Sequence, residues 1–579
     1  MNGDTRSHAP RVPGSRLRAL FPPAVWLRQY RGAWLRFDLV AGLTLAAYAI
    51  PVSLAYATLA GLPPVYGVYC YLVAGPAYAL FGSSRQLAIG PTSAISMLVG
   101  TTVAGMALGD PARYAEIAAL TALVFAAISV AAWLLRLSSL VNFISETILL
   151  GFKAGAALTI AMTQLPKLFG VKGGGHHFFE RAWILVTQLP DTNIAVLLFG
   201  LTAIALLLIG ERLLPGRPVA LLVVIAAIVA LSVTPLAQQG FKTVGVLPAG
   251  LPDFGLPSLR LGDVDGVIPL AFACFLLAYI EGVSAARSLA QKNGYEIDAR
   301  QELLALGAAN AAAALGQGYP VAGGLSQSTV NDKAGARTPL ALVFASCAIA
   351  LCLLFLTDLL RNLPDVVLAA IVLVAVKGLI NITELRRVHA LSRLEFWVAM
   401  VAFAGVLFLG ILQGVMLAAI VSVLLLIRRA AVPPVAQLGR VPGTRRYADR
   451  SRNPDAEDVP GALVVRVEAG LLYFNVGHVR EEVRRLAAGR GEGLRLVVWD
   501  LSTSPYIDIA GARMLAELAH EFAARGVALR LAEAHAVVRR LVHEESGLDV
   551  GATGVRVAVD EVIEGHERGA TKDRPAAPA

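Results

Sequence analysis

The sequence predicts an all-α polytopic membrane domain followed by a smaller soluble α/β domain. Three observations support this fold class. Of the 579 residues, 56% are hydrophobic and 16% are charged, whereas soluble domains carry about 25% charged residues. Apolar runs long enough to cross a bilayer, which takes about 20 residues, recur between residues 38 and 430. Beyond residue 460, short strand patterns alternate with helix patterns that have one apolar face, as in small α/β domains.

The first 37 residues form a basic segment ahead of the first span. Against one acid, Asp4, this segment holds seven arginines: Arg6, Arg11, Arg16, Arg18, Arg28, Arg31 and Arg36. Because such an excess marks the cytoplasmic side, we expect a cytoplasmic N-terminus and a location in the inner (plasma) membrane. No secretory signal peptide is recognisable before residue 38. The formal net charge of +9 therefore reflects topology, and we expect no nucleic-acid partner.

The membrane domain is predicted to contain about fourteen spans. They lie near residues 38–58, 64–82, 88–107, 115–135, 138–165, 193–211, 217–234, 266–288, 302–316, 326–334, 338–358, 363–380, 394–411 and 413–430. The third and the tenth contain "IGPTSAISMLVG" and "LSQSTVND", which begin with glycine, proline or small hydroxyl residues. Both are predicted to be half-helices preceded by extended chain. Their positions correspond in a seven-plus-seven inverted repeat, as in transporters built from such repeats.

Half-helices inside a membrane have a chemical consequence. Lipid cannot satisfy free backbone groups, so such segments must face protein or a water-filled cavity. Each half-helix directs its unpaired N–H groups and its positive dipole end into that cavity. Two facing N-termini would bind an anion without a buried lysine or arginine. We also expect Ser326 or Ser328 to cap the second half-helix.

The soluble part follows a change in composition after Arg429. Residues 431–460 are predicted to be a linker, because prolines and charged residues dominate them. Residues 461–566 contain strand-like segments such as "ALVVRVEAGLLYF" and "LRLVVWDLS", together with helix-like segments. They are predicted to form a small α/β domain. Residues 567–579 are predicted to be a disordered tail.

Several long segments resemble the signature segments of the SulP anion-transporter family. They are "DLVAGLTLAAYAIPVSLAYATLAGLPPVYGVYCYLVAGPAYALFGSSRQLAIGPTSAISM", "IEGVSAARSLAQKNGYEIDARQELLALGAAN" and "LSQSTVNDKAGARTPL". This resemblance covers roughly residues 30–565 and ends in what looks like the family's STAS domain. It implies core and gate subdomains, a homodimer in the lipid bilayer, a cytoplasmic STAS domain, and transport of small inorganic anions such as sulfate.

The resemblance also implies an anion pocket. Carried over by position, its residues are Tyr56 in the first span, Pro91, Thr92 and Ser93 at the start of the third, and Leu325, Ser326 and Gln327 at the start of the tenth. Many sulfate-type members have glutamine where this chain has Val52 and arginine where it has Gln327. Loss of the guanidinium removes a pair of parallel N–H donors suited to a divalent oxyanion. A bicarbonate, chloride or C4-dicarboxylate substrate therefore stays open beside a sulfate-like one.

Two charged residues in the spans are candidates for coupling. Glu281 lies late in the run "PLAFACFLLAYIEG", where an acid is costly and typical of a functional site. It matches the acidic position of the family's proton-coupled members, so we predict proton symport through it; the alternative is an acid at the membrane interface. Lys153 lies near the centre of its span. It is predicted either to supply the positive charge lost at Gln327 or to pair with Glu146 or snorkel.

No enzymatic constellation is recognisable, and we expect neither a metal nor a cofactor. In the soluble domain, Asp508 is followed by Ile509 and Ala510 in place of hydroxyl residues. We therefore expect no phosphorylation switch in this loop. Two classes of function remain: a secondary anion transporter, or a membrane-anchored regulator in which the STAS-like domain is the output and the spans are a sensor. The half-helices and Glu281 favour transport, because an anchor needs neither.

Overall fold

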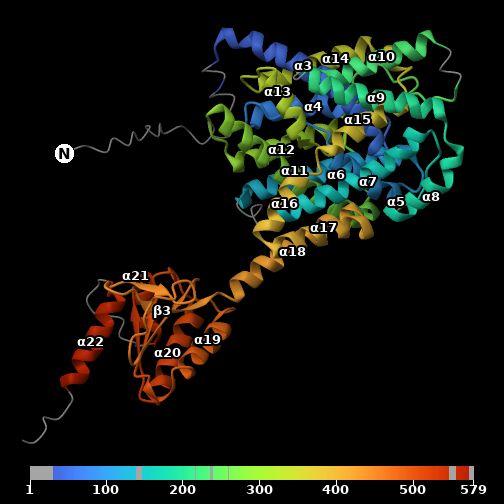
Figure 1. Ribbon diagram of the computed structural model, residues 1–579. Helices are drawn as coiled ribbons and strands as arrows, with labels where there is room; N and C mark the ends of the chain where they lie inside the picture. Colours follow the sequence, from blue (N-terminus) through green and yellow to red (C-terminus); the bar gives the residue numbers. More distant parts are fainter. Residues whose placement is uncertain are drawn as a thin grey trace, which may run out of the picture. The chain divides into compact units, whose positions relative to one another are not determined.

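The structure, a computed structural model, describes residues 26, 30–138, 146–175, 177–214, 217–234, 239–258, 260–546 and 556–572. The chain forms two compact units, Met1–Ser422 and Val423–Ala579 (Figure 1). Most of the basic N-terminal segment, including five of its seven arginines, lies outside the described residues; Arg31 and Arg36 lie within them.

Helices occupy all fourteen positions predicted for spans. They are α3 (Leu35–Leu59), α4 (Val65–Phe81), α5 (Ser93–Ala107), α6 (Pro111–Leu134), α7 (Glu146–Phe169), α9 (Ile194–Leu213), α10 (Val219–Val233), α11 (Val264–Asn293), α12 (Ala299–Leu315), α13 (Leu325–Lys333), α14 (Leu340–Phe355), α15 (Asp365–Lys377), α17 (Arg393–Leu409) and α18 (Ile411–Ala431). Within the described residues, seven helices are long and apolar enough to cross a membrane by length and composition, and four shorter apolar helices accompany them. The predicted all-α membrane domain is confirmed, and 139–145 of its fifth span lie outside the description.

Two further helices, α8 (Phe178–Gln188) and α16 (Ile382–Leu391), were not predicted. Each is too short to span a bilayer. Each also has charged residues between its apolar ones along the sequence, for example Arg181 in α8 and Arg387 in α16. A search for continuous apolar runs therefore passes over them, because their periodicity is that of an amphipathic helix.

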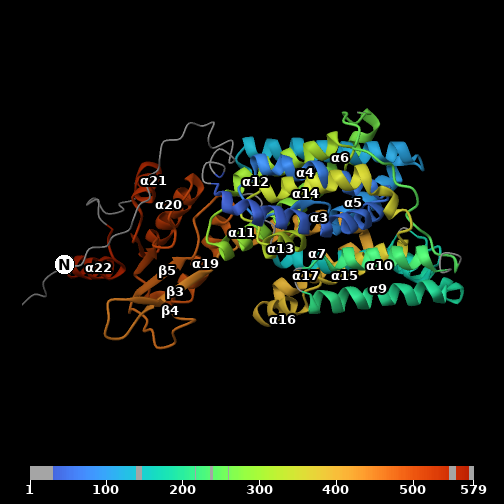
Figure 2. The ribbon, with the colours of Figure 1, turned by 90° about the horizontal axis from the view of Figure 1, so that it is seen from above.

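The helices pack as two groups. In the first group, α12 packs on α4 and α6, α14 packs on α3 and α4, and α11 packs on α6. In the second group, α17 packs on α7, and α15 packs on α7 and α9. Figure 2 shows α4, α6, α12 and α14 in one layer and α9, α10, α15 and α17 in another. Each group draws helices from both halves of the chain, as the predicted core and gate subdomains require.

A short crossing of two strands lies inside the first group. Strand β1 (Ile89–Gly90) pairs antiparallel with β2 (Ala322–Gly323), and the chain continues from them into α5 and α13. The close approach requires glycine: a Cβ on Gly90 would lie 2.3 Å from the Tyr71 ring. The predicted extended segments ahead of both half-helices are therefore present, and their pairing brings the two helix starts together.

The second unit contains a five-stranded sheet. Its strands are β3 (Val435–Arg440), β4 (Tyr447–Asp449), β5 (Ala462–Val467), β6 (Leu496–Asp500) and β7 (Ala528–Ala532), in the order β4-β3-β5-β6-β7. Strands β5, β6 and β7 are parallel, and β3 is antiparallel to its neighbours. The helices are α19 (Val476–Ala488), α20 (Ile509–Ala523), α21 (Ala536–Ser546) and α22 (Val559–Lys572).

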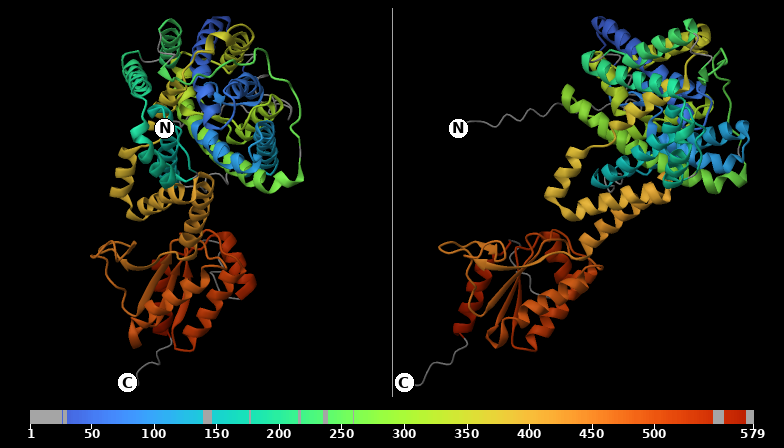
Figure 3. Two further views of the ribbon diagram at one scale, coloured as in Figure 1. Left: turned by 90° about the vertical axis from the view of Figure 1, so that its right-hand side faces the viewer. Right: turned by 45° about the vertical axis from the view of Figure 1, so that its right-hand side comes forward.

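Alternation along the strands builds two cores, one on each face of this sheet. Leu463 and Val465 of β5 belong to a core shared with α19, α20 and α21, whereas Val464 belongs to a second core with α22. Successive side chains of a strand point to opposite faces, so β5 is apolar on both faces except at Arg466. Figure 3 shows these strands, coloured orange to red, with helices against them.

Two predicted boundaries in this unit were wrong. The predicted linker, 431–460, contains β3 and β4, and β3 buries Ala436 and Leu438 against the sheet. The prolines before β3 and the arginines at and after its end concealed this alternation. The predicted tail, 567–579, begins inside α22, which continues to Lys572; residues 573–579 lie outside the description.

Candidate functional site

A cavity of about 410 Å³ lies where α3, α5, α7, α11, α13 and α15 meet; we call it the central cavity. All nine residues predicted from the sequence line it: Tyr56, Pro91, Thr92, Ser93, Lys153, Glu281, Leu325, Ser326 and Gln327. They come from five different helices or helix starts, and the pairing of β1 with β2 brings the starts of α5 and α13 together.

Both half-helices begin at this cavity without a side-chain cap. The residue before α5 is Thr92 and the residue before α13 is Gly324, and neither has a side chain that accepts a hydrogen bond from a helix N–H group. The first helical bonds run from Ser96 N to Thr92 O (2.9 Å) and from Ser328 N to Gly324 O (3.0 Å). The N–H groups ahead of these have no helical acceptor. Two positive dipole ends therefore border one cavity.

The hydroxyl groups at these starts are arranged differently from the expectation. Ser328 Oγ donates to Gly324 O (2.7 Å) and accepts a hydrogen bond from Ala88 N (2.9 Å). It therefore ties α13 to the segment before α5 and does not cap the helix. Ser326 does not cap it either and is exposed. In contrast, Thr92 Oγ1 is buried and has no hydrogen-bond partner among the described residues.

The Gln327 side chain braces the strand crossing. Its Nε2 donates to Ala88 O (3.0 Å) and to Ala322 O (3.2 Å), and its Oε1 accepts a hydrogen bond from the Tyr71 hydroxyl. The side chain has the geometry of a structural clamp, and the residue is 3% exposed. A direct contact between this amide and an anion stays a prediction.

Tyr56 closes one side of the central cavity. It lies one and a half turns beyond Pro51, inside α3, and is 7% exposed. It lines the cavity together with Ser93 at the start of α5. The predicted contribution of the first span is thus placed against the first half-helix.

One ion pair crosses the cavity. Lys153 Nζ lies 3.2 Å from Glu281 Oε1, and the two side chains are 28% and 13% exposed. The pair joins α7 of the second helix group to α11 of the first. Of the two alternatives for Lys153, pairing is observed, but with Glu281; the Glu146 side chain lies outside the described residues. Among the described lining residues only these two are charged, so the cavity has no net charge while both are ionised.

Other contributors were missed from the sequence. Ser284 and Ser288 line the central cavity with Glu281, and their spacing of three and four places them on one face of α11, which was a usable signal. Tyr71 offered none, because its partner Gln327 is distant in the chain. Within the described residues, no group of three or more His, Cys, Asp or Glu side chains is placed to hold a metal ion.

Sequence comparisons identify two matching families. The sulfate permease family matches residues 35–402, and the STAS domain matches residues 453–551. A probable sulfate transporter of Mycobacterium tuberculosis is 33% identical over 548 residues, covering 94% of this chain and 98% of the relative. The chloroplastic sulfate transporter 4.1 of Arabidopsis thaliana is 30% identical over 531 residues, covering 88% of this chain and 77% of the relative.

Solved structures share the fold. The murine Slc26a9 anion transporter in its inward-facing state matches with a TM-score of 0.86 at 24% identity, covering 97% of both chains. The transmembrane domain of a cyanobacterial bicarbonate transporter, BicA, matches with a TM-score of 0.60 at 21% identity, covering 67% of this chain and 98% of that chain.

Proposed function

We infer the function from one premise: this chain belongs to the sulfate permease family. We propose that it is a secondary transporter of small inorganic anions in the plasma membrane, working by alternating access and by proton symport. The anion is held in the central cavity between the starts of α5 and α13. Sulfate is the first candidate substrate, because the relatives at 30% identity or more are named as sulfate transporters. The STAS domain and N-terminus are cytoplasmic, and the protein is a homodimer.

The observation that carries this proposal is the pairing of β1 with β2. It directs two uncapped helix starts into one cavity, beside the buried and unpartnered Thr92 hydroxyl. Free N–H groups and a hydroxyl donor stabilise negative charge through oriented dipoles. Such a site binds an anion at short range and leaves it free to depart, as a carrier requires.

The ion pair supplies a mechanism for coupling. While Lys153 and Glu281 are both charged, their charges cancel, and an entering anion meets dipoles alone. Protonation of Glu281 removes its negative charge and leaves the Lys153 ammonium available to the anion. Anion and proton therefore bind cooperatively. Among the described residues, the titratable groups that line the cavity with Glu281 are Lys153 on α7 and Tyr48 and Tyr56 on α3.

The same pair connects binding to movement. It joins α7 to α11, which belong to the two helix groups. If the groups move relative to one another during transport, this contact must change. Protonation of Glu281 weakens the contact at the moment when the anion is bound. Each cotransported proton also removes one charge from the work against the membrane potential, which is about 2.3 kcal/mol per charge per 100 mV.

One observation favours a second substrate class. The cavity offers a single cation, already paired, and Gln327 uses its amide on the strand crossing. A monovalent anion such as bicarbonate or chloride fits this charge balance with less desolvation cost than a divalent one. A C4-dicarboxylate carrier and a STAS-domain sensor remain as outcomes of the test.

The test is uptake into proteoliposomes of sulfate, bicarbonate, chloride, nitrate, succinate and uracil, with and without an inward proton gradient. We expect uptake of at least one inorganic anion, accelerated by the gradient. The Glu281→Gln variant should still bind that anion and lose the acceleration. Uptake that responds equally to the gradient in both proteins would remove Glu281 from the mechanism. No flux of any solute through a correctly folded dimer would favour the sensor.

A further inference from the structure

A second cavity, also of about 410 Å³, shares four helices with the central cavity: α3, α5, α7 and α15. On α3, Tyr56 is the last residue that lines the central cavity, and Thr58 is the first that lines the second cavity. On α7, Lys153 is the last residue of the central cavity and Met162 is the first of the second. At a rise of 1.5 Å per residue, the step along α7 is about 13 Å. The two cavities therefore follow one another along one seam between the helix groups.

The second cavity lies at the end of the seam away from the N-terminus. Thr58 is in the last turn of α3, and Lys167 is in the last turn of α7. Helix α15 runs the opposite way, and its first residue, Asp365, lines the same cavity. Since the arginines place the start of α3 in the cytoplasm, this cavity faces the external side of the membrane.

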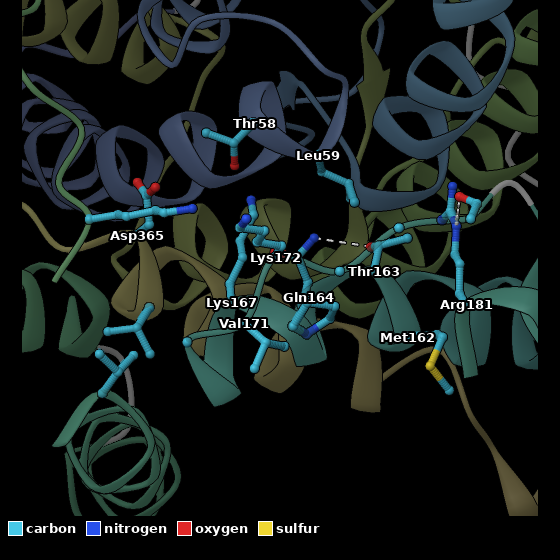
Figure 4. A pocket seen from close by; sticks show the side chains of 18 of the residues that line it. Thr58, Leu59, Met162, Thr163, Gln164, Lys167, Val171, Lys172, Arg181 and Asp365 are labelled. Carbon is cyan, nitrogen blue, oxygen red and sulfur yellow. Dashed lines mark hydrogen bonds between the residues drawn. The ribbon is translucent and has the colours of Figure 1, made fainter. Parts of the chain in front are cut away.

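Positive charge dominates this cavity, which we call the outer basic pocket. It is lined by Lys167, Lys172, Arg181 and Lys242 against one acid, Asp365. None of the four cations forms a salt bridge with another described residue. In the view of Figure 4, Lys167 and Lys172 lie between Asp365 and Arg181. The charged groups lining the pocket thus sum to an excess of three positive charges.

The loops that carry these cations are anchored. Gly173, next to Lys172, donates from its backbone N to Gln188 Oε1 (2.8 Å). Lys242 O accepts a hydrogen bond from Asp365 N (2.9 Å), which ties its loop to the start of α15. Arg181 Nε donates to Gly175 O (3.1 Å), which leaves the terminal nitrogens of the guanidinium without a described partner. Burial lowers the pKa of Arg181, because its surroundings solvate the charge less well than water.

We propose that the outer basic pocket is a second binding site for small inorganic anions, which collects them at the external face before the seam opens to the central cavity. A concave site of one sign focuses the field and raises the local concentration of counter-ions. Cations that have no ion-pair partner and are partly removed from water are stabilised most by a bound anion. That the bound anion then passes inward to the central cavity rests on the proposed function, whereas anion binding in the outer basic pocket does not.

Binding is tested on the full chain with the central cavity blocked. Radiolabelled sulfate is the probe, added at low ionic strength to protein in a neutral detergent, in the Ser326→Phe background. We expect residual sulfate binding that Lys172→Glu weakens by about tenfold or more. Arg361→Glu is the matched control, because Arg361 is exposed and does not line the pocket; it should leave binding unchanged. Absence of residual binding, or equal losses in both variants, would overturn the proposal.

Transport gives a second readout that separates the two proposals. In intact cells given external sulfate at low ionic strength, Lys172→Glu should raise KM about three- to tenfold and leave kcat unchanged, and added salt should shrink the effect. A fall in kcat at unchanged KM would contradict an external collecting site. If wild type transports no anion but the blocked protein still binds sulfate, the proposed function fails and the outer site stands. If wild type transports an anion but the blocked protein binds no sulfate, the outer site fails and the proposed function stands.

Discussion

The central cavity and the outer basic pocket share four helices, yet they attract an anion in different ways. The charges of Lys153 and Glu281 cancel in the central cavity, and the remaining attraction comes from the helix starts. In the outer pocket, four cations face one acid. Fixed charge acts over about 8–10 Å at ordinary salt concentrations, whereas N–H groups act only in contact. On the two proposals above, the outer basic pocket collects the anion and the central cavity binds it together with a proton.

The largest expected effect is on the helix starts. Ser326→Phe places a ring at the start of α13, where the free N–H groups border the cavity, and should weaken binding in the central cavity about a hundredfold or more, equivalent to about 2.8 kcal/mol. Ser326→Ala is the control and should bind nearly as wild type, because the N–H groups are retained. The measurement is anion affinity of folded dimers at an ionic strength that suppresses the outer pocket. Undiminished affinity in Ser326→Phe would remove α13 from the site.

The next effect separates the two members of the ion pair. Lys153→Gln removes the cation that protonation releases, so anion affinity should fall about tenfold, or about 1.4 kcal/mol. Glu281→Gln leaves Lys153 permanently unpaired, so affinity should be kept or increased and should no longer depend on pH. Affinities at two pH values in both variants make the comparison. If both variants lose affinity alike, the pair is a structural link between α7 and α11 and does not couple.

A smaller effect tests the crossing that makes the central cavity. Gly90→Ala would drive a Cβ to within 2.3 Å of the Tyr71 ring, and overpacking of this kind costs about 1–3 kcal/mol. Gly105→Ala in α5 is the control, because a Cβ there meets nothing within 4 Å and alanine favours the helix by about 0.5–1 kcal/mol. Thermal unfolding in detergent should separate the two variants in opposite directions. Equal stabilities would mean that the crossing tolerates a wider separation.

The smallest effect concerns the second unit. Residues up to Ser422 form a compact unit that packs mainly on itself. A chain that ends after α18, at Ala431, should therefore keep its anion affinity within about twofold. Transport rate and abundance in the membrane are free to fall. The measurement is sulfate affinity of the shortened chain beside the full chain. A stable, inserted chain that has lost all anion binding would show that the second unit completes the site.

The sequence was most informative where chemistry leaves little choice. Glycine, proline and small hydroxyl residues within apolar runs predicted both half-helices, because lipid excludes unpaired backbone elsewhere. The segments quoted at the start also predicted the family, which the match over residues 35–402 confirms. All nine predicted residues line one cavity, although their contact with an anion stays a prediction.

What escaped prediction depends on long-range pairing or on mixed patterns. The partner of Lys153 lies on another helix group, and the Tyr71 hydroxyl reaches Gln327 from α4; no local periodicity encodes either contact. Strand β3 was hidden because its alternation is short and flanked by prolines and charges. The outer basic pocket was missed for a related reason, since its cations come from α7, α8 and two loops.

The most direct test of the account is the proton taken up when an anion binds. Sulfate, or the anion that transports best, is added to the full-length protein in weakly buffered solution, and the pH change is recorded. If binding draws a proton to Glu281, the solution becomes more alkaline in wild type and stays unchanged in Glu281→Gln, while both proteins bind the anion. Binding without a pH change in wild type, or the same change in Glu281→Gln, would contradict coupling through this ion pair.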